Sequence, residues 1–211
     1  MADKKLIITI GRQYGSGGAE VGRKLAEKLG INVYDKNILR MNSDESGIEE
    51  SYFHLADEKA GNRLLYKIIS SLTPDKSAPS YGADLISADN LFRFQSSVIR
   101  RLAASETCII VGRCGNYVLQ DQMDNLVRIF VYADTVTRIR RVMDVDKVDE
   151  AEALRRMKRI DKERTEYHRY FTGREWMDME NYDLLFAILH IQYNYECDLD
   201  SKLEPLLSKL F

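Results

Sequence analysis

Short apolar runs alternate along the chain with segments whose apolar residues recur at helical spacing. The runs are rich in Ile, Val and Leu, which is typical of strands buried on both faces of a parallel sheet. They lie at Leu6–Ile10, Ile31–Tyr34, Cys108–Val111, Leu126–Ala133 and Tyr182–Leu189. Because helical patterns separate these runs, the sequence predicts a doubly wound α/β domain with helices on both faces of a parallel sheet.

The segments between the predicted strands carry the helical patterns. Helices are predicted at Glu20–Leu29, Asn37–Met41, Ala83–Ala104, Thr135–Met143, Val148–Tyr170 and Leu199–Leu210, with two weaker patterns within Ile48–Leu72. Loops are predicted at the polar segment Asn42–Gly47 and at Thr73–Gly82, which holds two of the three prolines. No internal repeat is visible, so residues 1–211 are predicted to form a single domain.

Composition narrows the class of protein. A chain of 211 residues with 45% hydrophobic content can bury a substantial core. The net charge of −2 gives no overall field that favours nucleic acid, so any basic site must be local. Three cysteines without disulfide or metal-ligand spacing suit a reducing compartment. Neither a signal peptide nor an apolar run of about 18 residues is found, so we expect a cytoplasmic protein with no membrane span.

A glycine cluster stands between the first predicted strand and the first predicted helix. It consists of Gly11, Gly15, Gly17 and Gly18. A strand, a glycine loop and a helix make a phosphate cradle, because backbone N–H groups converge there and the helix dipole favours an anion. The P-loop pattern ends in Gly-Lys-Ser/Thr, however, whereas this loop ends in Gly17-Gly18-Ala19. The alternative is a tight turn with no ligand.

Two charged residues follow predicted strands directly. Asp35 ends the second strand, and Arg113 follows the third. Open α/β sheets bind ligands outside the carboxyl ends of their strands, so both residues are candidates for a binding site. The alternative for Asp35 is to cap the helix at Asn37–Met41, and the alternative for Arg113 is a surface position in a turn.

The predicted helix at Val148–Tyr170 is heavily basic. Arg155, Arg159 and Lys162 fall on one side of it, and such a cluster of donors suits a polyphosphate. The alternative is a solvated face with i, i+4 ion pairs, such as Arg159 with Glu163. Nearby aromatic residues either stack on a base or pack in the core, and these are Tyr167, Tyr170, Phe171 and Trp176.

Five segments, taken together, point to a known family. They are ITIGRQYGSGG at Ile8–Gly18, LAEKLGINVYDKNIL at Leu25–Leu39, VGRCGNYVL at Val111–Leu119, VRIFVYADTVTRIRRVM at Val127–Met143 and IDKERTEYHRYFTGREWMDMENYDLL at Ile160–Leu185. In these segments the sequence resembles the cytidylate kinase-like family of P-loop nucleoside monophosphate kinases. The region Glu49–Leu102 and the tail after Leu189 match weakly.

The resemblance implies a fold and an activity. The fold is a P-loop NTPase-like three-layer α/β fold, in which a five-stranded parallel sheet has helices on both faces and a helical lid. A monophosphate-binding helical region is expected at residues 36–104 and a basic lid at residues 145–176. The implied reaction is phosphoryl transfer from ATP with Mg²⁺ to CMP or dCMP, with no protein ligand for Mg²⁺ identified. The expected partners are nucleotides, with no membrane and no specific nucleic acid; an oligomeric state is not predicted.

The resemblance, and the needs of the reaction that it implies, assign residues to roles. The nucleotide-binding set is Gly11, Tyr14, Gly15, Ser16, Gly17, Gly18 and Ala19. The substrate-binding set is Asp35, Arg40, Arg113, Asp161 and Arg164, in which Asp161 and Arg164 keep the three-residue spacing of an aspartate and an arginine in the family's lid. The catalytic set is Arg12, Arg155, Arg159 and Arg164.

The loop departs from the pattern of active cytidylate kinases. Gly18 occupies the position of the lysine, Ala19 and Glu20 those of the hydroxyls, and Cys114 that of an aspartate. Arg12 is the expected substitute for the lysine, although pairing with Asp35 or Glu20 is an alternative for it. A second hypothesis is therefore a nucleotide- or phospholigand-binding sensor or regulatory protein without turnover. In a third, the basic lid serves a protein or nucleic-acid partner.

Overall fold

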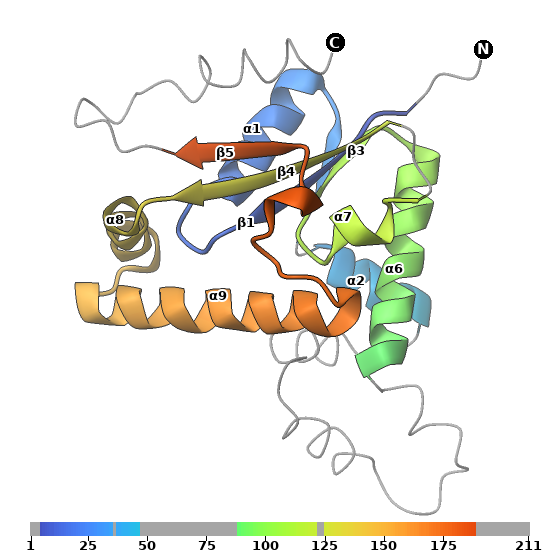
Figure 1. The fold of residues 1–211 in the computed structure, drawn as a ribbon. Helices are drawn as coiled ribbons and strands as arrows, with labels where there is room; N and C mark the ends of the chain where they lie inside the picture. The colour runs from blue at the N-terminus through green and yellow to red at the C-terminus, as the bar shows by residue number, and fades with distance from the viewer. Residues whose placement is uncertain (1–4, 36, 47–87, 122–124, 189–211) are drawn as a thin grey trace, which may run out of the picture.

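A computed structural model describes residues 5–35, 37–46, 88–121 and 125–188 (Figure 1). Its centre is a five-stranded sheet in the order β2-β3-β1-β4-β5, in which all neighbouring strands are parallel. The strands are β1 (Ile7–Arg12), β2 (Asn32–Tyr34), β3 (Cys108–Val111), β4 (Leu126–Ala133) and β5 (Leu184–Ile188). Each predicted run therefore forms a strand, and the predicted five-stranded parallel sheet is confirmed.

The helices follow the predicted alternation with strands. They are α1 (Gly18–Leu29), α2 (Asn37–Ser46), α6 (Ala88–Ser105), α7 (Gly115–Val118), α8 (Thr135–Asp146) and α9 (Glu150–Thr172), with a 3₁₀ turn η1 (Met179–Asn181). None of the helices in the described ranges has both the length and the apolar character of a membrane span. The predicted patterns at Ile48–Leu72, Thr73–Gly82 and Leu199–Leu210 lie outside the described residues, as does much of the region 36–104.

One predicted loop is wrong. Residues 42–46 of the predicted loop Asn42–Gly47 belong to α2, which runs to Ser46. Ile38 on α2 is fully buried and packs in one cluster with Val98 and Leu102 of α6. Tertiary packing of this kind extends helices through polar segments whose own composition favours a loop.

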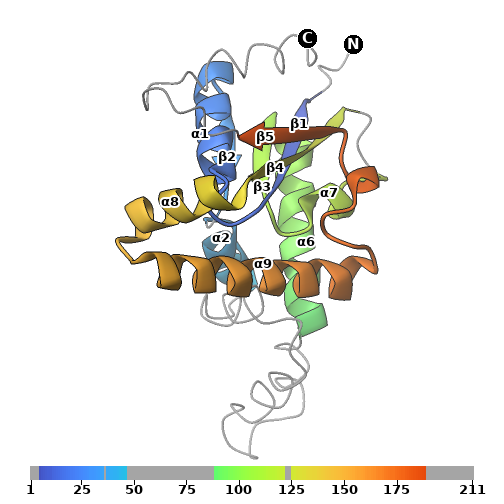
Figure 2. The ribbon, with the colours of Figure 1, turned by 60° about the vertical axis from the view of Figure 1, so that its left-hand side comes forward.

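Side chains of β1 pack into the core on both faces of the sheet. Successive side chains of a strand point to opposite faces. Ile8 and Ile10 accordingly pack with Val21 and Leu25 of α1, whereas Ile7 packs with residues of α6. Figures 1 and 2 show α1 on one face of the sheet and α6 and α7 on the other. Because β1 is central, the loop that follows it leaves the middle of the sheet.

The basic helix α9 crosses the carboxyl end of the sheet (Figure 2). Its caps set its length: the Asp149 side chain accepts a hydrogen bond from the N–H of Glu152, and Gly173 closes the helix at φ 70°. At the far end of α9, Phe171 stacks on Phe92 of α6 with ring centroids 4.1 Å apart. The stack connects the end of α9 to α6.

Truncation of Leu25 tests the packing between α1 and the sheet. Leu25 is fully buried, so we expect Leu25→Ala to lower the free energy of unfolding by about 2–5 kcal/mol, measured by urea denaturation. The control Val145→Ala removes a side chain that is 68% exposed and is expected to change it by less than about 0.5 kcal/mol. Equal effects of the two changes would contradict the packing described here.

Candidate active site

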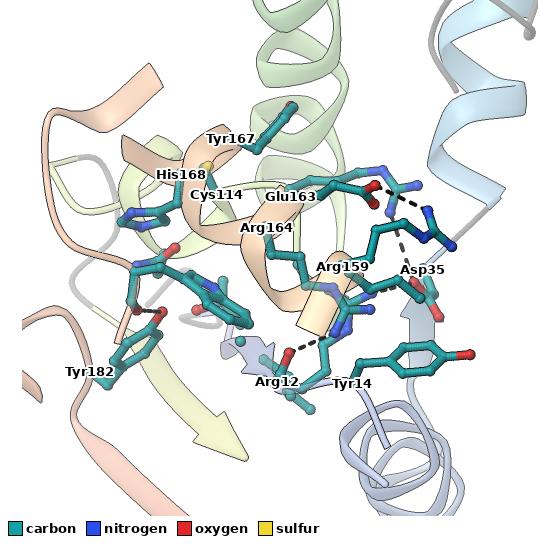
Figure 3. Close-up of a pocket in the computed structure, with 18 residues that line it drawn as sticks. Arg12, Tyr14, Asp35, Cys114, Arg159, Glu163, Arg164, Tyr167, His168 and Tyr182 are labelled. Carbon is teal, nitrogen blue, oxygen red and sulfur yellow. Dashed lines mark hydrogen bonds and ion pairs between the residues drawn. The ribbon is translucent and has the colours of Figure 1, made fainter. Parts of the chain in front are cut away.

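A pocket of about 390 Å³ lies at the carboxyl end of the sheet, between β1, β3 and α9 (Figure 3). Its walls carry cationic, acidic and aromatic side chains. The cations are Arg12, Arg113, Arg159 and Arg164, the acids are Asp35 and Glu163, and the large aromatics are Tyr14, Tyr167, Trp176 and Tyr182. The pocket therefore combines a basic surface with apolar area, which suits an anionic ligand with an organic body.

The side chain of Arg12 lies across two glycines. A Cβ atom placed on Gly18 would overlap the Cβ of Arg12 and lie 3.0 Å from its Cγ and 3.1 Å from the Cβ of Val131. A Cβ on Gly112 would overlap Nη1 of Arg12 and lie 3.1 Å from its Cζ. Both glycines are therefore positions of close approach. The Arg12 stem takes the space that a side chain at position 18 would need.

A left-handed turn follows β3 and directs Arg113 inward. Gly112, Arg113 and Cys114 have φ values of 80°, 54° and 52°. Each non-glycine residue in this region costs about 1–2 kcal/mol, so two in succession are an unusual strain. The turn leaves Arg113 only 7% exposed and in the wall of the pocket. The alternative of a surface arginine is therefore wrong.

Asp35 is held between the two arginines. Its Oδ1 lies 3.5 Å from Nη2 of Arg12 and 3.8 Å from Nη1 of Arg113. The carboxylate thus faces the pocket, as its strand-end position predicts, and of the two carboxylates considered as partners of Arg12 the structure pairs it with Asp35. Glu20 pairs instead with Arg141 of α8. Two guanidinium groups, the kind of donor that binds phosphate in a bidentate way, thus meet at one carboxylate in the pocket wall.

Helix α9 fixes the backbone of the loop after β1. Asp161 Oδ1 accepts a hydrogen bond from the N–H of Tyr14 at 2.7 Å, and the same carboxylate forms an ion pair with Arg138. Arg164 donates from Nη1 to the carbonyl oxygen of Arg12 at 2.9 Å, and its guanidinium lies 5.7 Å from the centre of the Tyr14 ring. Asp161 holds the loop and does not line the pocket. Arg164 both holds the loop and lines the pocket.

The Tyr14 side chain is also held in place, by a hydrogen bond to α8. Its hydroxyl donates a hydrogen bond to Oδ2 of Asp146 at 2.5 Å. Burial, and then this hydrogen bond, raise the pKa of Tyr14 above its ordinary value. The hydrogen bond to Asp146 connects the loop after β1 with the end of α8.

The glycine loop itself packs against α8. A Cβ on Gly15 would lie 2.8 Å from Cγ2 of Val142, and Gly15 and Gly17 have φ values of 77° and 83°. Ser16 donates from Oγ to the carbonyl oxygen of Gln13 at 2.8 Å. At the start of α1 the N–H of Gly18 donates to Oγ of Ser16 at 3.4 Å, and the N–H of Glu20 donates to the carbonyl oxygen of Gly17 at 2.9 Å. The helix dipole still favours an anion at this end of α1. The residues Gly15 to Gly18 do not line the pocket, whereas Gly11 and Tyr14 do.

Three predicted cations lie outside the pocket wall. The Arg155 side chain is 74% exposed and pairs with Glu152, and Lys162 pairs with Glu166. Arg40 is exposed on α2. Arg155 precedes the pocket by a helical turn, about 5 Å along the axis, so sharing a side of α9 does not bring it to the site. Arg159 does line the pocket, and it also forms the predicted pair with Glu163 at 3.0 Å.

Residues in the pocket and beside it also include some with no predicted role. Arg138 supports Asp161 and donates from Nε to the carbonyl oxygen of Tyr14 at 2.7 Å. Thr9 and His168 line the pocket, and both are nearly fully buried. The only sequence signal for His168 is its position one turn after Arg164. Thr9 has the weaker signal of a polar residue within an apolar strand.

The loop does not fit a magnesium site built by the protein. Ala19 has no oxygen ligand in its side chain, and the Glu20 carboxylate is engaged by Arg141. In the part of the chain that the structure describes, no three His, Cys, Asp or Glu residues gather closely enough to hold a metal ion. We therefore assign no step to a metal.

Comparison with protein families shows which family the chain belongs to. The model of the cytidylate kinase-like family matches residues 7–190. The chain belongs to this family. The resemblance noted in the sequence is thereby confirmed, and the central sheet, the loop and α9 all fall within the matched range. No curated protein matches this cytidylate kinase-like chain.

Solved structures share the fold of this cytidylate kinase-like protein. An uncharacterized protein from Eubacterium ventriosum is 27% identical over 98% of each chain, with a TM-score of 0.66. The protein TT1252 from Thermus thermophilus is 17% identical over 99% of this chain and 100% of its own, with a TM-score of 0.50. A shikimate kinase from Acinetobacter baumannii in complex with shikimate is 16% identical over 98% and 94%, with a TM-score of 0.46. The first two support the fold alone.

A double-mutant cycle tests the contact between Arg12 and Gly18. We expect Gly18→Ala to lower the free energy of unfolding of this cytidylate kinase-like protein by about 1–3 kcal/mol, because the new methyl group overlaps Arg12. In an Arg12→Gly background the overlap with that side chain is absent, so most of the cost should vanish. Equal costs in the two backgrounds, measured by urea denaturation, would show that Arg12 does not pack on Gly18.

Proposed function

We propose that this protein transfers a phosphoryl group from ATP to CMP or dCMP. The observation that supports this most strongly is the meeting of Arg12 and Arg113 at Asp35, in a pocket beside the glycine loop. Phosphoryl transfer asks little covalent chemistry of a protein. It requires two anionic groups held in line and charge to neutralise the moving group.

The acceptor phosphate is assigned to Arg113. Its side chain is 4% exposed, so its charge is little screened by solvent. A guanidinium group can bridge two phosphate oxygens at once, which a lysine cannot. The strained turn at Arg113 and Cys114 fits this role, because such strain gathers at functional sites.

The donor phosphates are assigned to the loop and the N-terminus of α1. Arg12 connects this region with the acceptor, since its stem passes over Gly18 and its guanidinium lies on Gly112. In our proposal Arg12 supplies the charge that the lysine of a P-loop would supply. Arg159 and Arg164 reach the pocket from α9, and α9 excludes water that would otherwise hydrolyse ATP.

The second candidate is a nucleotide- or phospholigand-binding protein without turnover. It is favoured by the ion pair between Glu20 and Arg141, which places a carboxylate in the first turn of α1. A negative charge there competes with a bound anion for the helix N-terminus. The lack of a lysine at Gly18 supports the same candidate.

A coupled assay of ADP formation tests the proposed reaction. We expect ADP to form from ATP only when CMP or dCMP is added, and Arg113→Ala to lower kcat/KM for CMP by about 100-fold or more, as for loss of one transition-state donor. Arg100→Ala is the matched control, because Arg100 is an exposed arginine on α6. It should retain wild-type rates.

Calorimetry on the same variants separates the two candidates. Binding of CMP without CMP-dependent ADP formation at high enzyme concentration would favour the sensor and contradict the kinase. If Arg100→Ala loses as much activity as Arg113→Ala, the effect of Arg113→Ala is not specific to the pocket, and the role assigned to Arg113 is contradicted.

A further inference from the structure

The pocket has two chemically different ends. Figure 3 shows Arg12, Arg159 and Asp35 on one side and His168 and Tyr182 on the other. The first side carries the charges that bind an anion. The second is built from neutral polar and aromatic groups, and the reaction proposed above gives none of them a role.

His168 offers a hydrogen-bond acceptor at this second end. The residue is 3% exposed, and its Nδ1 lies 3.1 Å from the carbonyl oxygen of Arg174. Because a carbonyl oxygen can only accept, Nδ1 carries the proton and Nε2 keeps its lone pair. Burial lowers the pKa of His168, which favours the neutral ring. Nε2 is buried and has no hydrogen-bond partner among the described residues.

Thr9 offers a second buried polar atom in the same pocket. The residue is 2% exposed, and its Oγ1 has no hydrogen-bond partner within the described ranges. Thr9 lies two residues before Gly11 on β1, so both face the same side of the sheet. A buried polar group without a partner destabilises a fold, and a ligand that supplies the partner explains its presence.

An aromatic surface adjoins these groups. The rings of Phe130 and Tyr182 lie with centroids 4.9 Å apart, and Trp176 packs edge-on against Phe130. The Tyr182 hydroxyl is already used, since it donates to the carbonyl oxygen of Trp176 at 2.8 Å. Gly11 lets these rings pack directly on β1, because a Cβ there would lie 2.8 Å from the Phe130 ring and 3.0 Å from the Tyr182 ring. Of the three aromatic residues, Trp176 and Tyr182 line the pocket, so a planar group bound there can contact them.

We propose that the neutral end of the pocket selects ligands that carry an amino group on a planar ring, with Nε2 of His168 accepting a hydrogen bond from that group. The Thr9 hydroxyl bonds a second polar atom of the same ring. This inference rests on the proposed function: with a phosphate at Arg113, the ring is the base of the acceptor nucleotide. Cytosine presents an amino N–H where uracil presents a carbonyl oxygen, which His168 cannot bind. His168 is thus a specificity-determining residue.

Calorimetry with three probes tests His168. CMP and UMP differ in the group that His168 binds, and ribose 5-phosphate keeps the phosphate and lacks the base. The variant His168→Asn can still donate from its amide to the Arg174 carbonyl, but it has no atom at the position of Nε2. We expect it to weaken CMP binding about tenfold and to leave UMP and ribose 5-phosphate within about twofold.

Thr9→Val provides an independent test. Valine keeps the β-branched shape and removes the unpartnered hydroxyl, so its Tm should equal or exceed that of the wild type. CMP binding should nevertheless weaken severalfold. A lower Tm with unchanged CMP binding would show a structural role for Thr9 and would overturn its place in the proposal.

The outcomes separate this inference from the function on which it rests. If the wild type binds CMP, UMP and ribose 5-phosphate equally, the phosphate site stands and the recognition of the base is overturned. If it binds none of the three, both are overturned. An equal loss of all three probes in His168→Asn would show that His168 only supports the fold.

Discussion

The site depends on the side chain of Arg12, which packs against the backbone at two glycines, Gly18 and Gly112. Arg12 leaves the central strand, passes over the first residue of α1 and ends on the turn after β3. That path is open only because Gly18 and Gly112 have no side chains. Position 18 must therefore be glycine for Arg12 to pack as it does. A lysine at position 18 and the observed position of the Arg12 side chain exclude each other.

The surrounding contacts keep this arrangement in place. The backbone of Arg12 accepts a hydrogen bond from Arg164, and the next turn is held by Asp161 through the N–H of Tyr14. The far end of the Arg12 side chain meets Asp35. Groups fixed by their neighbours before a ligand arrives lose little freedom when it binds, which is how preorganised sites stabilise charge. The cost is visible in the left-handed conformations of Arg113 and Cys114.

The pattern of apolar and polar residues along the chain predicted the sheet, but only part of the candidate site. The five strands were predictable because each buries a short apolar run on both faces, and Arg113 because a residue after a buried parallel strand must lie at the carboxyl edge. Arg155 lies outside the pocket wall, because helical periodicity gives the side of α9 and not the position along it. The Arg12–Gly18 contact and the unpartnered atoms of Thr9 and His168 depend on how distant elements pack, which no local pattern contains.

The most direct test of the account restores the lysine. CMP-dependent ADP formation should be measured for the wild type and Gly18→Lys in parallel. If Arg12 has taken the place of the P-loop lysine, the new side chain must displace it, so Gly18→Lys should turn over more slowly than the wild type. A Gly18→Lys protein that turns over faster would show that the loop merely lacks its lysine, and would contradict the account.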